Sequence, residues 1–167
     1  MERLWAPWRL TYVSNAAGGD PGQCIFCAAL NSEDLSPLLV FRGERAFVIL
    51  NKFPYSNGHL MVVPVRHVGR MADTGLEELY ELIALTRTAE MALTETYKVH
   101  GLNVGINLGR SAGAGVLEHL HIHVVPRWEG DTNFMTTISG TRVVPEEPEH
   151  SVVRLKPMFE RIVRTQK

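Results

Sequence analysis

Short apolar segments bounded by turn residues recur along the chain, some of them alternating with polar residues, and one long segment of helical spacing lies between them. A short apolar run between Gly, Pro or Asn turn residues is typical of a strand, and alternation with a period of two, as at residues 102–108, is typical of a half-buried one. On this basis we expect strands at residues 38–41, 46–50, 59–65 and 102–108. The order of these segments favours an α+β domain with an antiparallel sheet.

The long segment begins at Thr74-Gly-Leu-Glu77, which fits a helix-capping sequence. Apolar residues then recur every three or four positions up to about Tyr97, and this spacing predicts one long helix. The tail after Pro145 predicts further helix, with Pro157 as a break or kink because proline removes a backbone donor.

Residues 119–125 read His-Leu-His-Ile-His-Val-Val, which alternates three imidazoles with apolar side chains. In a strand, side chains two residues apart share a face at a spacing of about 7 Å. We therefore expect His119, His121 and His123 on one face of a strand. Leu120, Ile122 and Val124 then occupy the opposite, buried face. A helix would scatter the three rings, because residues two apart on a helix do not face each other.

The length of 167 residues favours a single domain. We expect an N-terminal arm at 1–23, a main domain at 24–140, and a C-terminal extension at 141–167 that packs on the same domain. The arm is rich in Trp, Pro and Gly, and its aromatic residues are expected to dock on the body or on a partner subunit.

Composition narrows the classes of function. The net charge is −1, with 45% hydrophobic and 21% charged residues. This balance argues against coating a nucleic-acid polymer or a membrane through bulk charge, but it leaves room for one small anionic ligand. No segment resembles a signal peptide or a membrane span, and two cysteines do not make a secreted disulfide framework. We expect a soluble, cytoplasmic protein.

The histidine row can carry phosphorus chemistry. Histidine is a competent nucleophile near neutral pH when its other ring nitrogen is held by a hydrogen bond. The neighbouring rings and the backbone N–H groups of the glycine-rich loop 109–115, which follows Asn107, can donate to phosphate oxygens. Two other interpretations stay open: ordinary core or surface histidines, and a catalytic metal held by two or three of the rings.

Cys24-Ile-Phe-Cys27 has the spacing of a zinc-binding pair. No other cysteines are available, so histidines must complete the site, and His67 and His119 are plausible donors. A redox pair or two free thiols remain alternatives. Asn51 can bind ribose hydroxyls or serve as a turn residue, because its amide both donates and accepts.

The seven residues 119–125 satisfy the signature His-φ-His-φ-His-φ-φ, with φ apolar, and the chain resembles the histidine triad family of nucleotidyl hydrolases and transferases. The resemblance runs from about Cys24 to Asn133. It includes Asn51, the run from Gly58 to Pro64, and Arg66-His67-Val68. It implies a sheet of about five antiparallel strands in an α+β fold, and a homodimer.

The resemblance also implies roles for individual residues. His121 is the nucleophile that forms a nucleotidyl-phosphohistidine, His123 contacts the phosphate, and His59 is an additional active-site histidine. Cys24, Cys27, His67 and His119 are implied as ligands of a structural zinc ion, so that His119 is both first histidine of the triad and metal ligand. The implied nucleotide-binding residues are Asn51, Asn107, Ser111, Gly115, His123 and Asn133.

Two features bear on the branch of the family. Most hydrolase members carry Gln followed by Ser or Thr where this chain has Gly115 and Val116, so loop amides or Ser111 must replace a side-chain donor. The segments 4–9 and 126–134 resemble a bacterial branch that includes diadenosine tetraphosphate phosphorylases. There, inorganic phosphate rather than water removes the nucleotide from the histidine. Asn133 and Trp128 would either shape the phosphate site or serve as a turn residue and a core aromatic.

The sequence therefore predicts an enzyme that cleaves dinucleoside polyphosphates through a phosphohistidine, with no redox cofactor. The alternatives are a purine nucleoside phosphoramidase that uses the same nucleophile, a nucleotide-binding module with little activity, and a metal-dependent hydrolase.

Overall fold

The computed structural model describes residues 24–31, 36–131 and 146–165. Within these residues the chain forms one antiparallel sheet of five strands, in the order β1-β2-β3-β5-β4. The strands are β1 (Leu39–Arg42), β2 (Ala46–Leu50), β3 (Leu60–Pro64), β4 (Gly101–Ile106) and β5 (Ile122–Arg127). The α-helices are α2 (Ile25–Asn31), α3 (Leu76–Tyr97) and α5 (Pro148–Thr165), and the short 3₁₀ helices are η2 (Met71–Asp73) and η3 (Arg110–Ala112). The α+β prediction is confirmed.

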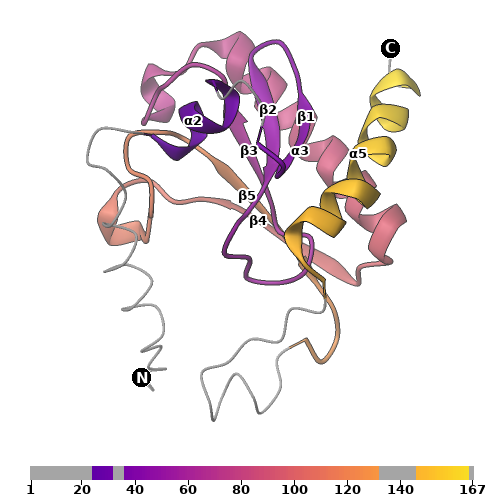
Figure 1. Ribbon diagram of the computed structural model, residues 1–167. Helices are drawn as coiled ribbons and strands as arrows, with labels where there is room; N and C mark the ends of the chain where they lie inside the picture. The colour runs from indigo at the N-terminus through magenta and orange to yellow at the C-terminus, as the bar shows by residue number, and fades with distance from the viewer. Residues whose placement is uncertain (1–23, 32–35, 132–145, 166–167) are drawn as a thin grey trace, which may run out of the picture.

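Helices cover the sheet on both faces (Figure 1). On one face, α3 and α5 pack over the central strands, where Leu93 and Phe159 are fully buried. On the other face, Phe26 and Leu30 of α2 pack against alternate residues of β1, β2 and β3. Strands buried on both faces read as continuous apolar runs rather than as alternation. That is why β2 and β3 have the sequences AFVIL and LMVVP, with every residue buried.

Strand β4 forms one edge of the sheet and pairs only with β5 among the described strands. The expectation of a half-buried strand holds for Leu102 and Ile106, which pack partly against the core. It is wrong for Val104, which is 54% exposed, and for Leu108, which lies beyond the strand. Alternation gives the face of a residue, but whether that face is covered at a sheet edge depends on a neighbouring element.

Helix α3 begins one residue later than the capping sequence predicts. The N-cap is Gly75, whose backbone N–H donates to Glu78 Oε2 at 2.8 Å. The Thr74 hydroxyl instead donates to the carbonyl of Arg70 at 2.9 Å, closing the preceding 3₁₀ turn. The cap therefore uses Glu78 in place of Glu77, because the Thr74 side chain is already engaged.

Helix α5 packs beside α3 and across β1, and the ring of Phe159 stacks on Phe41 with centroids 5.5 Å apart. It continues through Pro157, so of the two outcomes expected there, a break or a kink, the break is wrong. Proline leaves the carbonyl four residues earlier without its helical donor. Here that residue is Val153, and both lie on the exposed side of α5, where water can satisfy the carbonyl.

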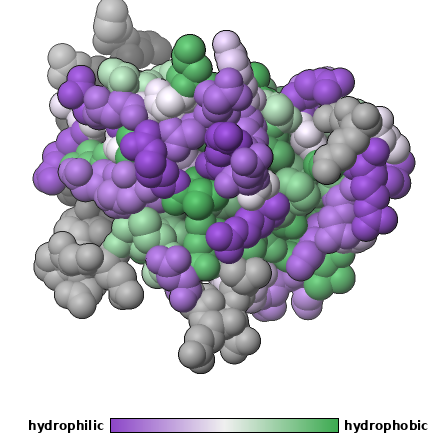
Figure 2. Space-filling model, turned by 90° about the horizontal axis from the view of Figure 1, so that it is seen from above, coloured by the Kyte–Doolittle hydropathy of each residue, from purple (hydrophilic) through white to green (hydrophobic). Residues whose placement is uncertain are grey.

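No helix in the described part of the chain is both long and apolar enough to span a membrane. Seen from above, hydrophobic residues are visible across the middle of the molecule between hydrophilic borders (Figure 2).

Candidate active site and metal cluster

The histidine row lies at the start of β5 rather than wholly within it. Strand β5 begins at Ile122, so His119 and His121 precede the strand and only His123 belongs to it. The reason is local pairing: the N–H of Leu120 donates to the carbonyl of Val68 at 2.7 Å instead of joining the ladder with β3. The alternation of faces nevertheless persists, and Leu120, Ile122 and Val124 all lie in the core beneath α3.

His121 is held as a neutral ring with one nitrogen available. Its Nδ1 lies 2.9 Å from the carbonyl oxygen of His119, and because a carbonyl only accepts, Nδ1 carries the proton and donates. Nε2 then bears a lone pair. Burial lowers the pKa of His121, which is 5% exposed, and this keeps the ring neutral near pH 7. A neutral imidazole with a fixed tautomer is the form that can act as a nucleophile.

A chain of hydrogen bonds determines which ring nitrogen carries the proton in His59 and in His123. The backbone N–H of Tyr55 donates to His59 Nδ1 at 3.1 Å, so the proton of neutral His59 sits on Nε2. That Nε2 lies 3.0 Å from His123 Nδ1 and donates to it. The proton of neutral His123 is therefore on its own Nε2. His123 thus presents a donor beside His121, whose ring centroid is 4.9 Å away.

This arrangement predicts a pH dependence of stability. Burial, and after it the neighbouring His121, lowers the pKa of His123 to about 4, whereas an unfolded histidine titrates near 6.5. Between these values the unfolded chain binds more protons, so the free energy of unfolding falls as pH drops from about 6.5 towards 4. We expect urea unfolding to show that His123→Asn reduces the stability difference between pH 7 and 4.5 by on the order of 2 kcal/mol. The exposed His150→Asn should leave it unchanged; an equal effect of both variants would contradict the assignment.

Two of the predicted nucleotide-binding residues, Asn51 and Asn107, lie near the histidine row. Asn51 is buried, with its Oδ1 accepting from the N–H of Phe53 at 2.9 Å and its Nδ2 3.4 Å from His59 Nδ1. Asn107 directly follows Ile106, which pairs with Ile122, so the chain brings it next to His121.

The other members of that set lie in or beyond the glycine-rich loop. Asn107 Nδ2 donates to the carbonyl of Gly113 at 3.4 Å and so braces this loop. Ser111 in η3 and Gly115 are both exposed. Asn133 lies outside the described residues. The structure thus places Asn51 against His59 and Asn107 at the base of the loop, while within the described residues neither Ser111 nor Gly115 is hydrogen-bonded to the rings.

The two cysteines and two of the histidines form one compact cluster. Cys24 immediately precedes α2, and Cys27 lies in its first turn. Cys24 Sγ is 3.2 Å from His119 Nδ1, and Cys27 Sγ is 3.6 Å from the same nitrogen and 3.3 Å from His67 Nδ1. All four candidate ligand atoms lie within 4.8 Å of one another.

These atoms fit a tetrahedral metal site. Zinc bonds of about 2.0–2.3 Å to nitrogen and sulfur set neighbouring ligand atoms roughly 3.3–3.8 Å apart in a tetrahedron, close to the three distances above. His119 is also correctly protonated for this role, because its Nε2 donates to the carbonyl of Pro64 at 2.9 Å and leaves the Nδ1 lone pair facing the thiols. The four residues can therefore hold a metal, and a closed Cys₂His₂ set is typical of a structural zinc ion.

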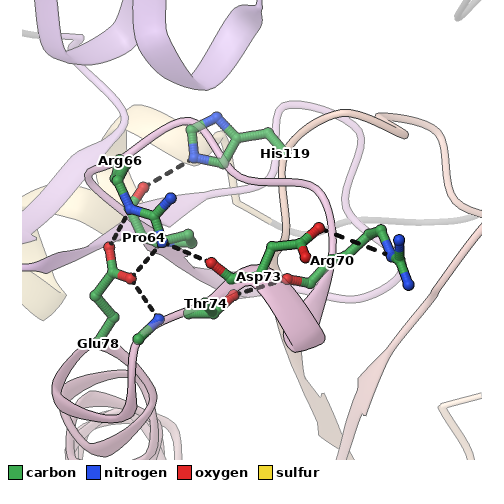
Figure 3. A network of polar contacts seen from close by, with 8 residues as sticks. Pro64, Arg66, Arg70, Asp73, Thr74, Glu78 and His119 are labelled. Atoms are coloured by element: carbon green, nitrogen blue, oxygen red, sulfur yellow. Dashed lines mark hydrogen bonds and ion pairs between the residues drawn. The ribbon is translucent and has the colours of Figure 1, made fainter.

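A network of polar contacts holds the turn that carries His67 (Figure 3). Arg66 donates to both carboxylate oxygens of Glu78, at 3.0 and 2.7 Å, and to the carbonyl of Asp73 at 2.8 Å. The carboxylate of Glu78 also caps α3, so the end of β3 and the start of α3 share one anchor. His67 is consequently presented to the cluster from a turn fixed at both ends.

Sequence reasoning missed three residues around the rings. Phe26 lies between the two cysteines and packs on His119 and His121, with ring centroids 5.4 and 5.1 Å away. Tyr55 contacts His59 through its backbone N–H and its ring. Glu146, further from the rings, accepts a hydrogen bond from Asn57 in the loop before His59. An aromatic residue inside a C-x-x-C pair was a usable signal for Phe26, whereas backbone donation by Tyr55 has no signature in the sequence.

Comparison with known proteins gives consistent matches. Residues 34–130 match the model of the HIT domain family. The chain is 42% identical over 153 residues to the AP-4-A phosphorylase of Mycobacterium tuberculosis, covering 87% of this chain and 78% of that protein. A hypothetical histidine triad nucleotide-binding protein from Sulfolobus tokodaii superposes with a TM-score of 0.70 at 30% identity, covering 85% of this chain and 95% of that one. A Zn-bound histidine triad family protein from Mycobacterium smegmatis gives 0.63 at 25% identity, covering 93% and 96%.

The α+β sheet with its histidine row and these matches together define an enzyme that processes nucleotides. The chain belongs to the histidine triad (HIT) family. The predicted family and the predicted class of enzyme are thereby confirmed.

Proposed function

We propose that the protein cleaves dinucleoside polyphosphates, with diadenosine tetraphosphate as substrate and inorganic phosphate as acceptor. The observation that carries this proposal is the tautomer of His121, which leaves Nε2 unprotonated beside the donor on His123. The relationship to a protein named AP-4-A phosphorylase, at 42% identity, supports the choice of substrate and acceptor.

The reaction proceeds in two displacements. His121 Nε2 forms a bond to the α-phosphorus as the bond from that phosphorus to its bridging oxygen breaks, and ATP leaves with the bridging electron pair. The ring then carries a positive charge, and its Nδ1–H continues to donate to the carbonyl of His119. An oxygen of inorganic phosphate attacks the same phosphorus, the N–P bond breaks, and ADP leaves with neutral His121 restored. Splitting one displacement into two lowers each barrier.

The surrounding residues bind and orient the nucleotide. His123 Nε2–H donates to a non-bridging phosphate oxygen, and His59 keeps that proton in place by donating to His123 Nδ1. The N–H groups of loop 109–115, with Ser111 and Gly115, receive the remaining phosphates, and Asn107 braces the loop. Asn51 and Asn133 complete the nucleotide site in this proposal.

A product assay tests the acceptor. With diadenosine tetraphosphate and inorganic phosphate we expect ADP and ATP in equal amounts. Without phosphate, turnover should fall at least about tenfold, because water must replace an anion that the site binds. Equal rates with AMP as product would show a hydrolase instead. An adenosine phosphoramidate assayed in parallel tests the alternative phosphoramidase, which would cleave the P–N bond faster than the polyphosphate.

Two further properties belong to this proposal. Zinc occupies the Cys24, Cys27, His67 and His119 cluster in a structural role, as supported by the fit of the donors and by a Zn-bound relative. The protein pairs as a homodimer across the edge strand β4, as supported by the exposed Val104 on that strand. Sedimentation at the mass of a single chain would count against the homodimer.

A further inference from the structure

The carboxylate of Glu146 accepts hydrogen bonds from three different parts of the fold. Its Oε2 accepts from the hydroxyls of Tyr97 and Ser151, both at 2.8 Å, and from Asn57 Nδ2 at 3.3 Å. Its Oε1 accepts from Arg154 Nη1 at 3.3 Å. These donors come from the end of α3, the first turns of α5 and the loop before β3. Glu146 therefore joins the two helices to the loop at one point.

The donors are fixed around this carboxylate. Burial raises the pKa of Tyr97 to about 12, so its hydroxyl keeps its proton and donates. The guanidinium of Arg154 lies 4.7 Å above the Tyr97 ring and also donates to the carbonyl of Thr96. Burial alone would raise the pKa of Glu146, but the hydrogen-bond donors outweigh it and lower that pKa, so the side chain is a carboxylate near neutral pH.

The link from Glu146 to the loop runs through Asn57. The Oδ1 of Asn57 is buried and has no hydrogen-bond partner among the described residues, while its Nδ2 faces the carboxylate. Leaving a buried acceptor unpaired is costly, so the contact with Glu146 decides the orientation of this amide. The next residue, Gly58, has φ +72 and lies so close to Tyr97 and Leu93 that a Cβ would come within 3.0–3.2 Å of their side chains. The loop is thus seated directly on the end of α3.

The same loop determines the state of the active-site rings. The Ser56 hydroxyl donates to the carbonyl of Pro126 in β5 at 2.7 Å, and the Ser56 carbonyl accepts from the N–H of His59. One residue earlier, the N–H of Tyr55 donates to His59 Nδ1. The proton of His59 therefore sits on Nε2, which donates to His123 Nδ1. A shift of the loop would remove the hydrogen bond that selects these tautomers.

We propose that Glu146 is a positioning residue that anchors the loop 51–59 through Asn57 and thereby holds His59 and His123 in the tautomers that phosphate binding requires. The inference rests on the proposed function for its kinetic consequence only. The tautomers themselves can be measured without any substrate.

The test compares Glu146→Gln with Glu147→Gln, which makes the same chemical change one residue later on an exposed side chain. For Glu146→Gln we expect kcat to fall about tenfold with KM changed less than about twofold, because the loss concerns orientation rather than substrate contact. In the absence of substrate, the imidazole ¹⁵N signals of His59 and His123 should move, while that of His119 stays in place. Glu147→Gln should match the parent protein in every measurement.

Asn57→Ala tests the same link without disturbing the contacts of Glu146 to the two helices. It should reproduce both the fall in kcat and the shifted signals, and the double variant should be no worse than either single variant. If Glu146→Gln fails to fold, Asn57→Ala decides the question. A lowered melting temperature with kcat and imidazole signals unchanged would overturn the proposal and leave Glu146 a purely structural residue. If the parent protein does not cleave the polyphosphate, moved signals still support the positioning role, and only the proposed function fails.

Discussion

Replacing His121 with alanine should abolish turnover while the protein stays folded. The change removes the nitrogen that would bond to phosphorus. In no other described histidine does Nδ1 donate to a carbonyl and so leave Nε2 unprotonated. Removing the nucleophile of a covalent mechanism commonly costs several orders of magnitude, and we expect a loss on the order of 10⁴-fold or more in kcat. The measurement is steady-state cleavage of diadenosine tetraphosphate, with circular dichroism and thermal melting recorded on the same sample.

The matched control is His150→Ala on the exposed side of α5, which should retain parent activity. A quenched reaction of the parent protein should also carry the nucleotide on a peptide that contains residue 121, and the variant should carry none. Turnover by His121→Ala within about tenfold of the parent would exclude this residue as the nucleophile and with it the covalent mechanism.

The sequence predicted the sheet well because its central strands are also its most apolar segments. The predicted strand at 46–50 coincides with β2, and the predicted helix ends at Tyr97 as α3 does. Errors arose where a side chain formed a different hydrogen bond from the expected one, or where no neighbouring element covered it. The Thr74 hydroxyl closes a 3₁₀ turn rather than capping α3, and Val104 is exposed because β4 is a sheet edge. Such outcomes depend on tertiary neighbours, which periodicity does not contain.

The candidate site was predicted to a similar degree. A period of two correctly put His119, His121 and His123 opposite the apolar residues, although hydrogen bonding to Val68 delays the strand to Ile122. Spacing suggested the metal cluster, and the fold brings its four side chains together. The tautomers could not be predicted, because each depends on how the folded chain places a hydrogen-bonding partner, whether that partner is distant in sequence, as the carbonyl of Pro64 is for His119, or only two residues away, as the carbonyl of His119 is for His121.

Removing the proposed zinc ion from the cluster should cost more stability than any single surface change. Burial raises the pKa of the Cys27 thiol, so in the absence of a metal this thiol stays protonated and supplies no negative charge to the cluster. Helix α2 has seven residues, too few to be stable without tertiary support. Structural zinc contributes on the order of 10–16 kcal/mol to small zinc domains. This protein also has a large core, so we expect chelation to lower its free energy of unfolding by at least about 3 kcal/mol.

The effect should reach the active site through Phe26, whose ring covers both His119 and His121. Loss of the cluster releases α2 and exposes the His121 ring to water. It also frees His119, whose carbonyl fixes the tautomer of His121. Hydrogen exchange should therefore rise in α2 and around residues 119–121 upon chelation, together with a fall in activity. The double variant Cys24→Ser, Cys27→Ser is the control, because the chelator should change neither its stability nor its exchange. A parent protein that keeps its stability and α2 protection after complete metal removal would contradict a structural metal at this site.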